Sequence, residues 1–236
     1  MTATTMSSTR ATSEKAVFWE VLWRSAGIQA VGLFVLADWL AGSQPRIGAS
    51  ADELIGFYSA NSFQILMAAA LTGLATLNLM WFASAIRVTL EDAGKGGWGA
   101  SATASSAAFG ALLLLITSIG ATLAYVGASP GNAALLSGLN TLSWSVSVLI
   151  AFPRAMLIMS AAFGLWRAKI MSNGLFTLGV LFVIAGVVSG TTWMNSGAWT
   201  PDGEFARFVA PSLLFVWVII VSWVLFTHRL AARTGW

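Results

Sequence analysis

Two charged side chains lie deep within long apolar stretches, and they are the best candidates for chemistry in this chain. Asp38 directly follows the apolar run 26–37, and Arg154 stands near the middle of the run 141–165. A charge inside a bilayer costs about 3 kcal/mol or more, so it is retained where it has a partner or a function. Arg154 is therefore a candidate site for an anion, and Asp38 is its candidate partner.

The two charges are expected to face each other directly or through water. Side chains of a helix lean toward its N-terminus, and the two runs are predicted to cross the membrane in opposite directions. The lean offsets much of a depth difference of roughly 10 Å at 1.5 Å per residue. Pro153 frees the carbonyl of Leu149, and a kink there makes room for water or a ligand. Further polar candidates on neighbouring stretches are Asn78, Gln29 and Asn140.

Two interpretations of the charged pair stay open at this point. It is either a buried ion pair that fixes helix packing, or a site in which Arg154 binds an anionic headgroup or a small anion. A proton relay needs a second membrane acid or a histidine. The single histidine, His228, follows the last apolar run.

Residue types that common membrane enzymes require are missing from the sequence. With no cysteine and one histidine, thiolate chemistry, haem held by two histidines and histidine-rich metal sites are excluded. The apolar runs also lack the pair of aspartates that aspartyl proteolysis needs. We therefore predict no catalytic residue, no metal and no cofactor, and we favour a binding protein over an enzyme.

These candidates must be positioned by a bundle of membrane helices. The chain is 57% hydrophobic and 9% charged, whereas soluble domains carry about 25% charged residues. A membrane helix needs about 20 mainly apolar residues. Six stretches qualify, at about 25–42, 62–86, 102–126, 141–165, 174–194 and 209–227. The predicted fold is all-α: a polytopic six-helix transmembrane domain over 17–236, after a mobile polar tail over 1–16.

Lysine and arginine placement predicts the orientation in the membrane. Nine of these residues fall on the side of both termini, whereas only Arg46 and Arg207 fall on the other side. Basic loops stay in the cytoplasm, so both termini are expected there, in a bacterial cytoplasmic membrane. The net charge of +3 is not gathered on one face, which argues against a nucleic-acid partner.

Helix-start and turn patterns occur in the outer loops. Ser50–Glu53 has the pattern of a capping box, which predicts a short helix over 51–60. Ser129-Pro130 and Thr200-Pro201 are typical of helix starts with proline in the first turn, and Thr200–Gly203 is also a strong turn pattern. Such helices can cover an opening between the spans, although we favour simple ordered connections.

Small residues spaced four apart mark faces on which helices approach closely. Gly186 and Gly190 form one such pair, and Ser160 and Gly164 form another. Packing within the chain is the favoured interpretation, and a homodimer through Gly186 and Gly190 is the alternative.

Three short motifs carry a resemblance to known proteins. Phe57-Tyr58 precedes the second stretch, Phe152-Pro153-x-Ala155 lies in the fourth, and Pro201-x-Gly203 precedes the sixth. With these motifs the chain resembles an uncharacterised family of six-span bacterial membrane proteins that is common in actinobacteria. The resemblance implies the six-span architecture and no activity.

The sequence thus predicts a multi-pass, non-enzymatic membrane protein that binds membrane lipids or a partner membrane protein. The alternative is a small transporter or channel for an anionic or amphipathic solute, lined by Arg154. A path across the membrane needs several converging polar groups, and the apolar stretches contain few, which favours binding. The predicted ligand-binding residues are Arg154, Asp38, Asn78 and Pro153.

Overall fold

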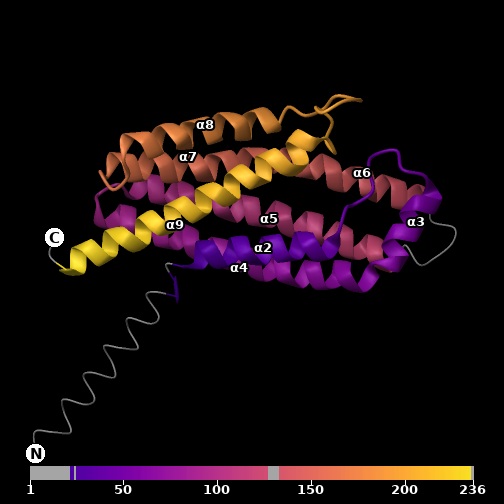
Figure 1. Ribbon diagram of the computed structural model, residues 1–236, viewed down its shortest axis with the longest axis horizontal. Coiled ribbons are helices and arrows are strands. Elements are labelled where there is room, and N and C mark those ends of the chain that lie inside the picture. The colour runs from indigo at the N-terminus through magenta and orange to yellow at the C-terminus, as the bar shows by residue number, and fades with distance from the viewer. Residues whose placement is uncertain (1–21, 24, 127–132, 235–236) are drawn as a thin grey trace, which may run out of the picture.

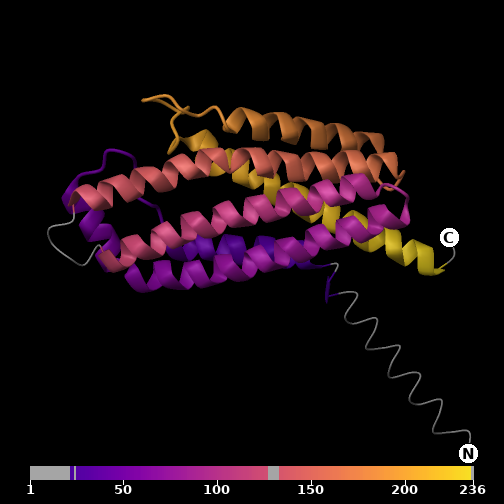
Figure 2. The ribbon, with the colours of Figure 1, turned by 180° about the vertical axis from the view of Figure 1, so that it is seen from behind.

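Long helices that run side by side form an elongated bundle (Figure 1; Figure 2). The computed structural model describes residues 22–23, 25–126 and 133–234, and these contain helices and no strand. The predicted tail over 1–16 and the predicted helix start at Ser129-Pro130 lie outside the described residues. The elements are α2 (Ala26–Ala41), α3 (Ala51–Ala60), α4 (Ser62–Asp92), α5 (Gly96–Val126), α6 (Ala133–Leu149), α7 (Ala151–Arg167), α8 (Asn173–Ser189), the π-helical turn η1 (Phe205–Val209) and α9 (Ala210–Thr234).

Four helical segments are long and apolar enough to cross a membrane. They are α4, α5, the joined α6 and α7 over Ala133–Arg167, and η1 with α9 over Phe205–His228. The other two predicted stretches correspond to the shorter apolar helices α2 and α8, of 16 and 17 residues. At 1.5 Å per residue, each is roughly 25 Å long, slightly less than the ~30 Å hydrocarbon core. The all-helical class of the prediction is confirmed, and its count of six spans stays a prediction.

The fourth predicted span is interrupted beside its proline. Regular helix stops at Ile150, between α6 and α7, and Pro153 lies in the first turn of α7. Backbone bonding still crosses the break, because Ile150 N–H donates to the Val146 carbonyl at 3.0 Å and Arg154 N–H to the Ile150 carbonyl at 3.2 Å. Proline is tolerated in a first helical turn, where its missing N–H would have no helical partner. The break places Arg154 one turn into a new helix.

We call the end of the bundle that holds α3 the outer end, after the predicted orientation. Figure 1 places the end of α9 at the opposite, inner end. The serine cap of the predicted capping box is present at the outer end, since the Ser50 hydroxyl accepts a hydrogen bond from Glu53 N–H at 3.2 Å. The helix start predicted at Thr200-Pro201 is wrong. Gly203 N–H instead closes a turn on the Thr200 carbonyl at 3.0 Å, and helical structure begins at Phe205.

Close helix contacts fill the inner half of the bundle with apolar side chains. Trp217, Phe82 and Leu157 are each 1–2% exposed there. The glycine faces pack within the chain. A Cβ on Gly186 would lie 3.1 Å from Ala155 Cβ, and one on Gly190 would lie 2.7 Å from the Phe152 ring. The face of α8 that carries Gly186 and Gly190 therefore packs against α7 within the chain.

Candidate ligand-binding site

A partly open cavity of 430 Å³ lies in the outer half of the bundle. Side chains from α2 to α7, from η1 and from α9 line it, and α8 stands behind Arg154. Binding sites for small molecules usually enclose about 300–1,000 Å³. The cavity therefore has the size of a ligand site, and it contains both of the charged residues that the sequence singled out.

The walls of the cavity differ in polarity. Ser143, Ser147 and Arg154 follow one another along α6 and α7, and all three line the same side. The facing walls come from α2, α5 and α9 and are mainly apolar, with Asp38, Thr117 and Ser212 as their polar members. They include Phe34, Phe109, Leu113, Ile116, Leu214 and Phe215. A space with one polar stripe and apolar walls suits a molecule that is itself amphipathic.

Arg154 is a buried cation with an unused hydrogen-bond donor. Its side chain is 5% exposed, and its Nη2 donates to the Ser189 hydroxyl at 2.6 Å. That hydroxyl in turn donates to the Gly186 carbonyl at 2.7 Å, so its own hydrogen is engaged. The Nε of Arg154 is buried and has no hydrogen-bond partner. Buried donors are normally paired, and among the described residues Trp217 Nε1 and Ser222 Oγ in the packed core are unpaired as well. Arg154 differs from these two because it is charged and lines the cavity, which makes it the candidate ligand-binding group.

The expected direct contact between Asp38 and Arg154 is not formed. Both side chains line the cavity, yet no ion pair joins them within the part of the chain that the structure describes. The cause is Ser189, which holds the guanidinium against α8, while Asp38 is exposed at the outer part of α2. A bridge through water stays a prediction.

The other predicted site residues separate into two groups. Asn78 does not line the cavity, because its amide donates to the Leu74 carbonyl of its own helix at 2.9 Å. Gln29 likewise bonds locally, to the Leu22 carbonyl at 3.1 Å. Pro153 is absent from the wall and contributes through the break beside Arg154. Asn140, by contrast, is central to the outer half.

A buried polar network around Asn140 fastens the segment after α2 to α3 and α6. Asn140 Oδ1 accepts from the Tyr58 hydroxyl at 2.8 Å and from Gln44 Nε2 at 3.1 Å. The Pro45 carbonyl accepts from Asn140 Nδ2 at 3.2 Å and from Trp144 Nε1 at 2.9 Å. This network fixes one rim of the cavity, because Gln44, Tyr58 and Trp144 also line it.

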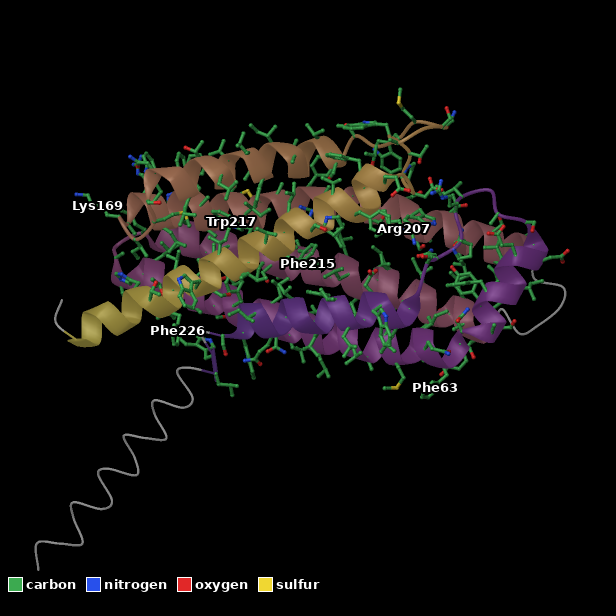
Figure 3. All side chains as sticks on the ribbon, in the orientation of Figure 1. Phe63, Lys169, Arg207, Phe215, Trp217 and Phe226 are labelled. Atoms are coloured by element: carbon green, nitrogen blue, oxygen red, sulfur yellow. The ribbon has the colours of Figure 1, made fainter. Side chains whose placement is uncertain are left out.

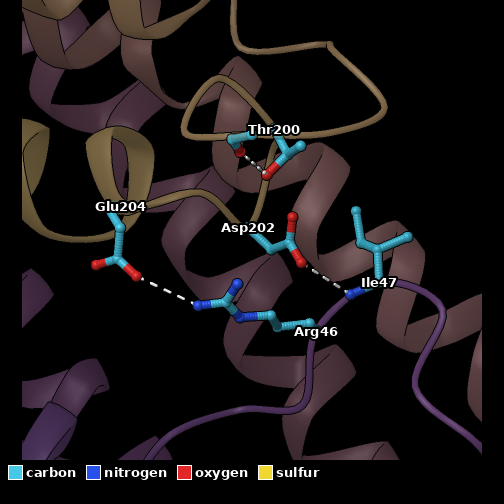
Figure 4. Close-up of polar contacts among 6 residues, drawn as sticks. Arg46, Ile47, Thr200, Asp202 and Glu204 are labelled. Carbon is cyan, nitrogen blue, oxygen red and sulfur yellow. Dashed lines mark hydrogen bonds and ion pairs between the residues drawn. The ribbon is translucent and has the colours of Figure 1, made fainter.

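The second rim is built from the loop before α9. Figure 4 shows how this loop meets the segment after α2: Arg46 forms an ion pair with Glu204 at 3.2 Å, and Asp202 Oδ2 accepts from Ile47 N–H at 3.1 Å. Arg207 in η1 also lines the cavity, and Figure 3 places it closer to the outer end than Phe215.

Sequence reasoning missed Arg207, Gln44 and Tyr58 as wall residues. Each lies in a loop, in η1 or in a short outer helix, where no apolar periodicity indicates what the side chain faces. The sequence offered two indications of this region, the Phe57-Tyr58 motif and Asn140.

Comparison of the chain with protein-family models, with curated proteins and with solved structures gives no match. The function is therefore argued from the cavity and from Arg154.

Proposed function

We propose that this chain is a six-span protein of a bacterial cytoplasmic membrane that binds an anionic amphiphile in its outer cavity. In this proposal both termini face the cytoplasm, and the protein acts as a lipid-binding or accessory component rather than as an enzyme. The four long apolar segments support residence in a membrane. The observation that carries the proposal is the buried Arg154, a cation that lines a partly apolar cavity and has no ion-pair partner among the described residues.

The packing of the inner half favours ligand binding over transport of a solute across the membrane. Below the cavity, the side chains of Phe82, Leu157, Trp217 and Leu225 form a dry core with at most 2% exposure. An ion path needs polar groups or water along its length. The cavity ends at that core, and none of these four side chains lines it. A molecule bound at Arg154 would therefore leave through the outer mouth by which it entered.

Binding can be tested on the protein purified in a neutral maltoside detergent. Native mass spectrometry of the wild type should detect a co-purified anionic amphiphile, and Arg154→Gln should lose it. Arg87→Gln is the matched control, since Arg87 is exposed and pairs with Glu91 at 2.7 Å far from the cavity. Equal occupancy in the wild type and Arg154→Gln, or an empty wild type after incubation with bacterial lipids, would overturn the proposal.

The orientation has a separate test, because the natural chain contains no cysteine. Single cysteines at Ala93, in the α4–α5 turn, and at Ser196, in the loop before η1, occupy exposed positions at opposite ends. A membrane-impermeant thiol reagent applied to intact cells should label Ser196→Cys and leave Ala93→Cys unlabelled. The reverse pattern would invert the proposed topology.

A further inference from the structure

Hydrogen-bond donors are scarce at the inner end of the cavity. Arg154 is the innermost residue that α6 and α7 contribute to the wall, eleven residues and roughly 16 Å from Ser143. The side chains that reach the same depth from α2, α5 and α9 are Phe34, Phe109 and Phe215, and the rings of Phe34 and Phe215 stack at 5.9 Å. A ligand group that reaches this depth therefore meets one cation among aromatic rings.

Most hydroxyl groups higher in the cavity do not add donors, and the exception is Ser212, an exposed residue at the outer start of α9. Thr72, Thr117, Ser143 and Ser147 each donate their hydrogen to a carbonyl of their own helix, at 2.6–3.0 Å. Tyr58 donates to Asn140, as described above. These oxygens can still accept hydrogen bonds, but their hydrogens are engaged. The guanidinium of Arg154 is thus the donor that an anion finds at the inner end.

This inventory distinguishes between kinds of anion. A carboxylate carries one charge and two oxygens, which a single guanidinium can satisfy. A phosphate dianion carries a second charge and further oxygens, and burying charge without a partner costs several kcal/mol. The inner end of the cavity therefore matches a monoanion with few acceptor atoms.

Two charges of opposite sign lie near the mouth and bear on the direction of the ligand. Asp38 is exposed in the outer part of α2 and would repel a carboxylate that stayed at the mouth. Arg207 would attract it, but Arg207 is only half-buried with its guanidinium 5.0 Å from the Phe208 ring, so this attraction is screened more than that of the buried Arg154. Between the mouth and Arg154, Leu113 and Ile116 offer an apolar wall to a hydrocarbon chain.

We infer that the ligand is a long-chain monocarboxylate, bound with its carboxylate on Arg154 at the inner end and its chain directed toward the mouth. This inference rests on the proposed function and narrows it from anionic amphiphiles to one chemical class. The carboxylate supplies the counter-charge that Arg154 lacks among the described residues. Ser189 acts as a positioning residue, because it holds Nη2 of a side chain that lines the cavity.

The test compares four probes that share or lack one feature of this ligand. Dodecanoate, dodecyl phosphate, dodecanol and acetate are titrated calorimetrically into the delipidated full chain in neutral maltoside detergent. A charge-assisted hydrogen bond contributes about 1.5–3 kcal/mol, which corresponds to about 10- to 100-fold in Kd. Dodecanoate should bind more tightly than dodecanol by that factor. Dodecyl phosphate should bind at least about tenfold more weakly than dodecanoate, and acetate should not compete with it.

Variants assign the effect to Arg154. Arg154→Met should weaken dodecanoate binding to the level of dodecanol, and Arg154→Lys should recover part of the affinity because it keeps the charge. Arg87→Met, the same substitution at an exposed arginine that does not line the cavity, should change affinity by less than about threefold. Thermal unfolding of each variant shows whether it is folded.

The direction of binding is tested with two modified fatty acids. The first, 2,2-dimethyldodecanoate, crowds the carboxylate and should bind more weakly than dodecanoate. The second carries a pyrene at the far end of its hydrocarbon chain and should keep its affinity.

The outcomes separate the two proposals. Dodecyl phosphate binding as tightly as dodecanoate, and depending on Arg154, would overturn the carboxylate inference and leave the proposed function standing. Acetate displacing dodecanoate at equal concentration would overturn the amphiphile in favour of a small anion. Dodecanol binding as well as dodecanoate, unaffected by Arg154→Met, or no binding of any probe, would overturn both. Loss of affinity on the pyrene-labelled chain alone would reverse the direction of the ligand.

Discussion

The two halves of the bundle use the same helices in opposite ways. Toward the inner end, α4, α5, α7 and α9 meet through small residues and bury large apolar side chains with almost no exposure. Toward the outer end, the same helices move apart around a cavity, and buried polar groups and loop contacts hold them in place. Close packing dominates the inner half, whereas the outer half combines a smaller apolar cluster around Leu54, Leu123 and Leu136 with buried hydrogen bonds.

This difference indicates where stability and function lie. Helices in a membrane associate through close packing and interhelical hydrogen bonds, because lipid is as apolar as their side chains. Close packing leaves no room for a ligand, whereas a network such as that of Asn140 fixes helices at a distance from one another. The chain therefore combines a rigid inner half with an outer half in which space is preserved. The predictions below compare matched substitutions in the two halves.

The largest contrast is expected between two glycines replaced by valine. A Cβ on Gly179 would lie 2.7 Å from the Trp217 ring and 2.9 Å from Ala162 Cβ, whereas one on Gly120, on the cavity wall, would meet nothing within 4 Å. Overpacking a filled core costs about 1–3 kcal/mol, so Gly179→Val should lower the free energy of unfolding by about 3 kcal/mol. Gly120→Val should change it by less than about 0.5 kcal/mol and reduce ligand binding.

Thermal or denaturant-induced unfolding in detergent measures both effects. Equal destabilisation by the two valines would mean that the outer cavity is filled and that the halves do not differ. A Gly120→Val protein that still binds the amphiphile at full affinity would place the ligand elsewhere.

The second contrast compares two asparagines replaced by leucine. Asn140→Leu removes the acceptor of Tyr58 and leaves that buried hydroxyl unpaired, while the Pro45 carbonyl loses one donor and keeps Trp144 Nε1. Such a loss costs about 1–3 kcal/mol. Asn78→Leu breaks only a bond within α4 and should be neutral or slightly stabilising. If the two variants unfold with equal free energies, the network does not hold the outer half together.

The sequence was informative where long apolar runs and short local patterns determine structure. The positions of the helices, the cap at Ser50 and the irregularity near Pro153 depend on neighbouring residues, and all are present. The choice of Arg154 rested on a general rule, the cost of a charge in a membrane, and the structure places that residue on a cavity wall.

The partners of these residues could not be predicted in the same way. Asp38 was expected to contact Arg154 because the two charges are opposite, but Ser189, from a helix distant in sequence, holds the guanidinium. A hydroxyl that ends an apolar helix gives no pattern from which this contact could be read. The same holds for Asp202, which accepts from Ile47 N–H instead of starting a helix with Pro201. Such choices are made by tertiary contacts.

A pH-dependent effect of about 1 kcal/mol is expected from Tyr58 in the outer network. Burial raises the pKa of Tyr58 above its ordinary value of 10, and the side chain of Gln44 partly opposes the shift. The unfolded chain releases this proton near pH 10, whereas the folded chain keeps it. Stability is therefore full below pH 10 and falls as the pH rises above it, by up to about 1.4 kcal/mol per pH unit.

Tyrosine content makes this measurable, since Tyr58 and Tyr125 are the two tyrosines of the chain. In a Tyr125→Phe background, the phenolate absorbance should appear only well above pH 10. In Tyr58→Phe, the loss of stability between pH 10 and pH 11 should be smaller. A phenolate signal from Tyr58 at its ordinary pKa in the folded protein would mean that water reaches the network.

The smallest effect is expected where the two outer rims meet. The side chains of Arg46 and Glu204 are 64% and 63% exposed, and pairs of this kind contribute about 0–1 kcal/mol. Glu204→Gln should lower stability by less than about 0.5 kcal/mol, and the difference should vanish at high salt because exposed charges are screened. Asp202→Asn is the matched change on the same loop, and its cost should persist in salt because its carboxylate is buried and accepts from Ile47 N–H. If Glu204→Gln instead lowered stability as much as Asn140→Leu, the exposed ion pair between Arg46 and Glu204 would be a main support of the outer half. Electrostatic attraction between the two rims would then have to be added to packing and hydrogen bonds as a third source of stability.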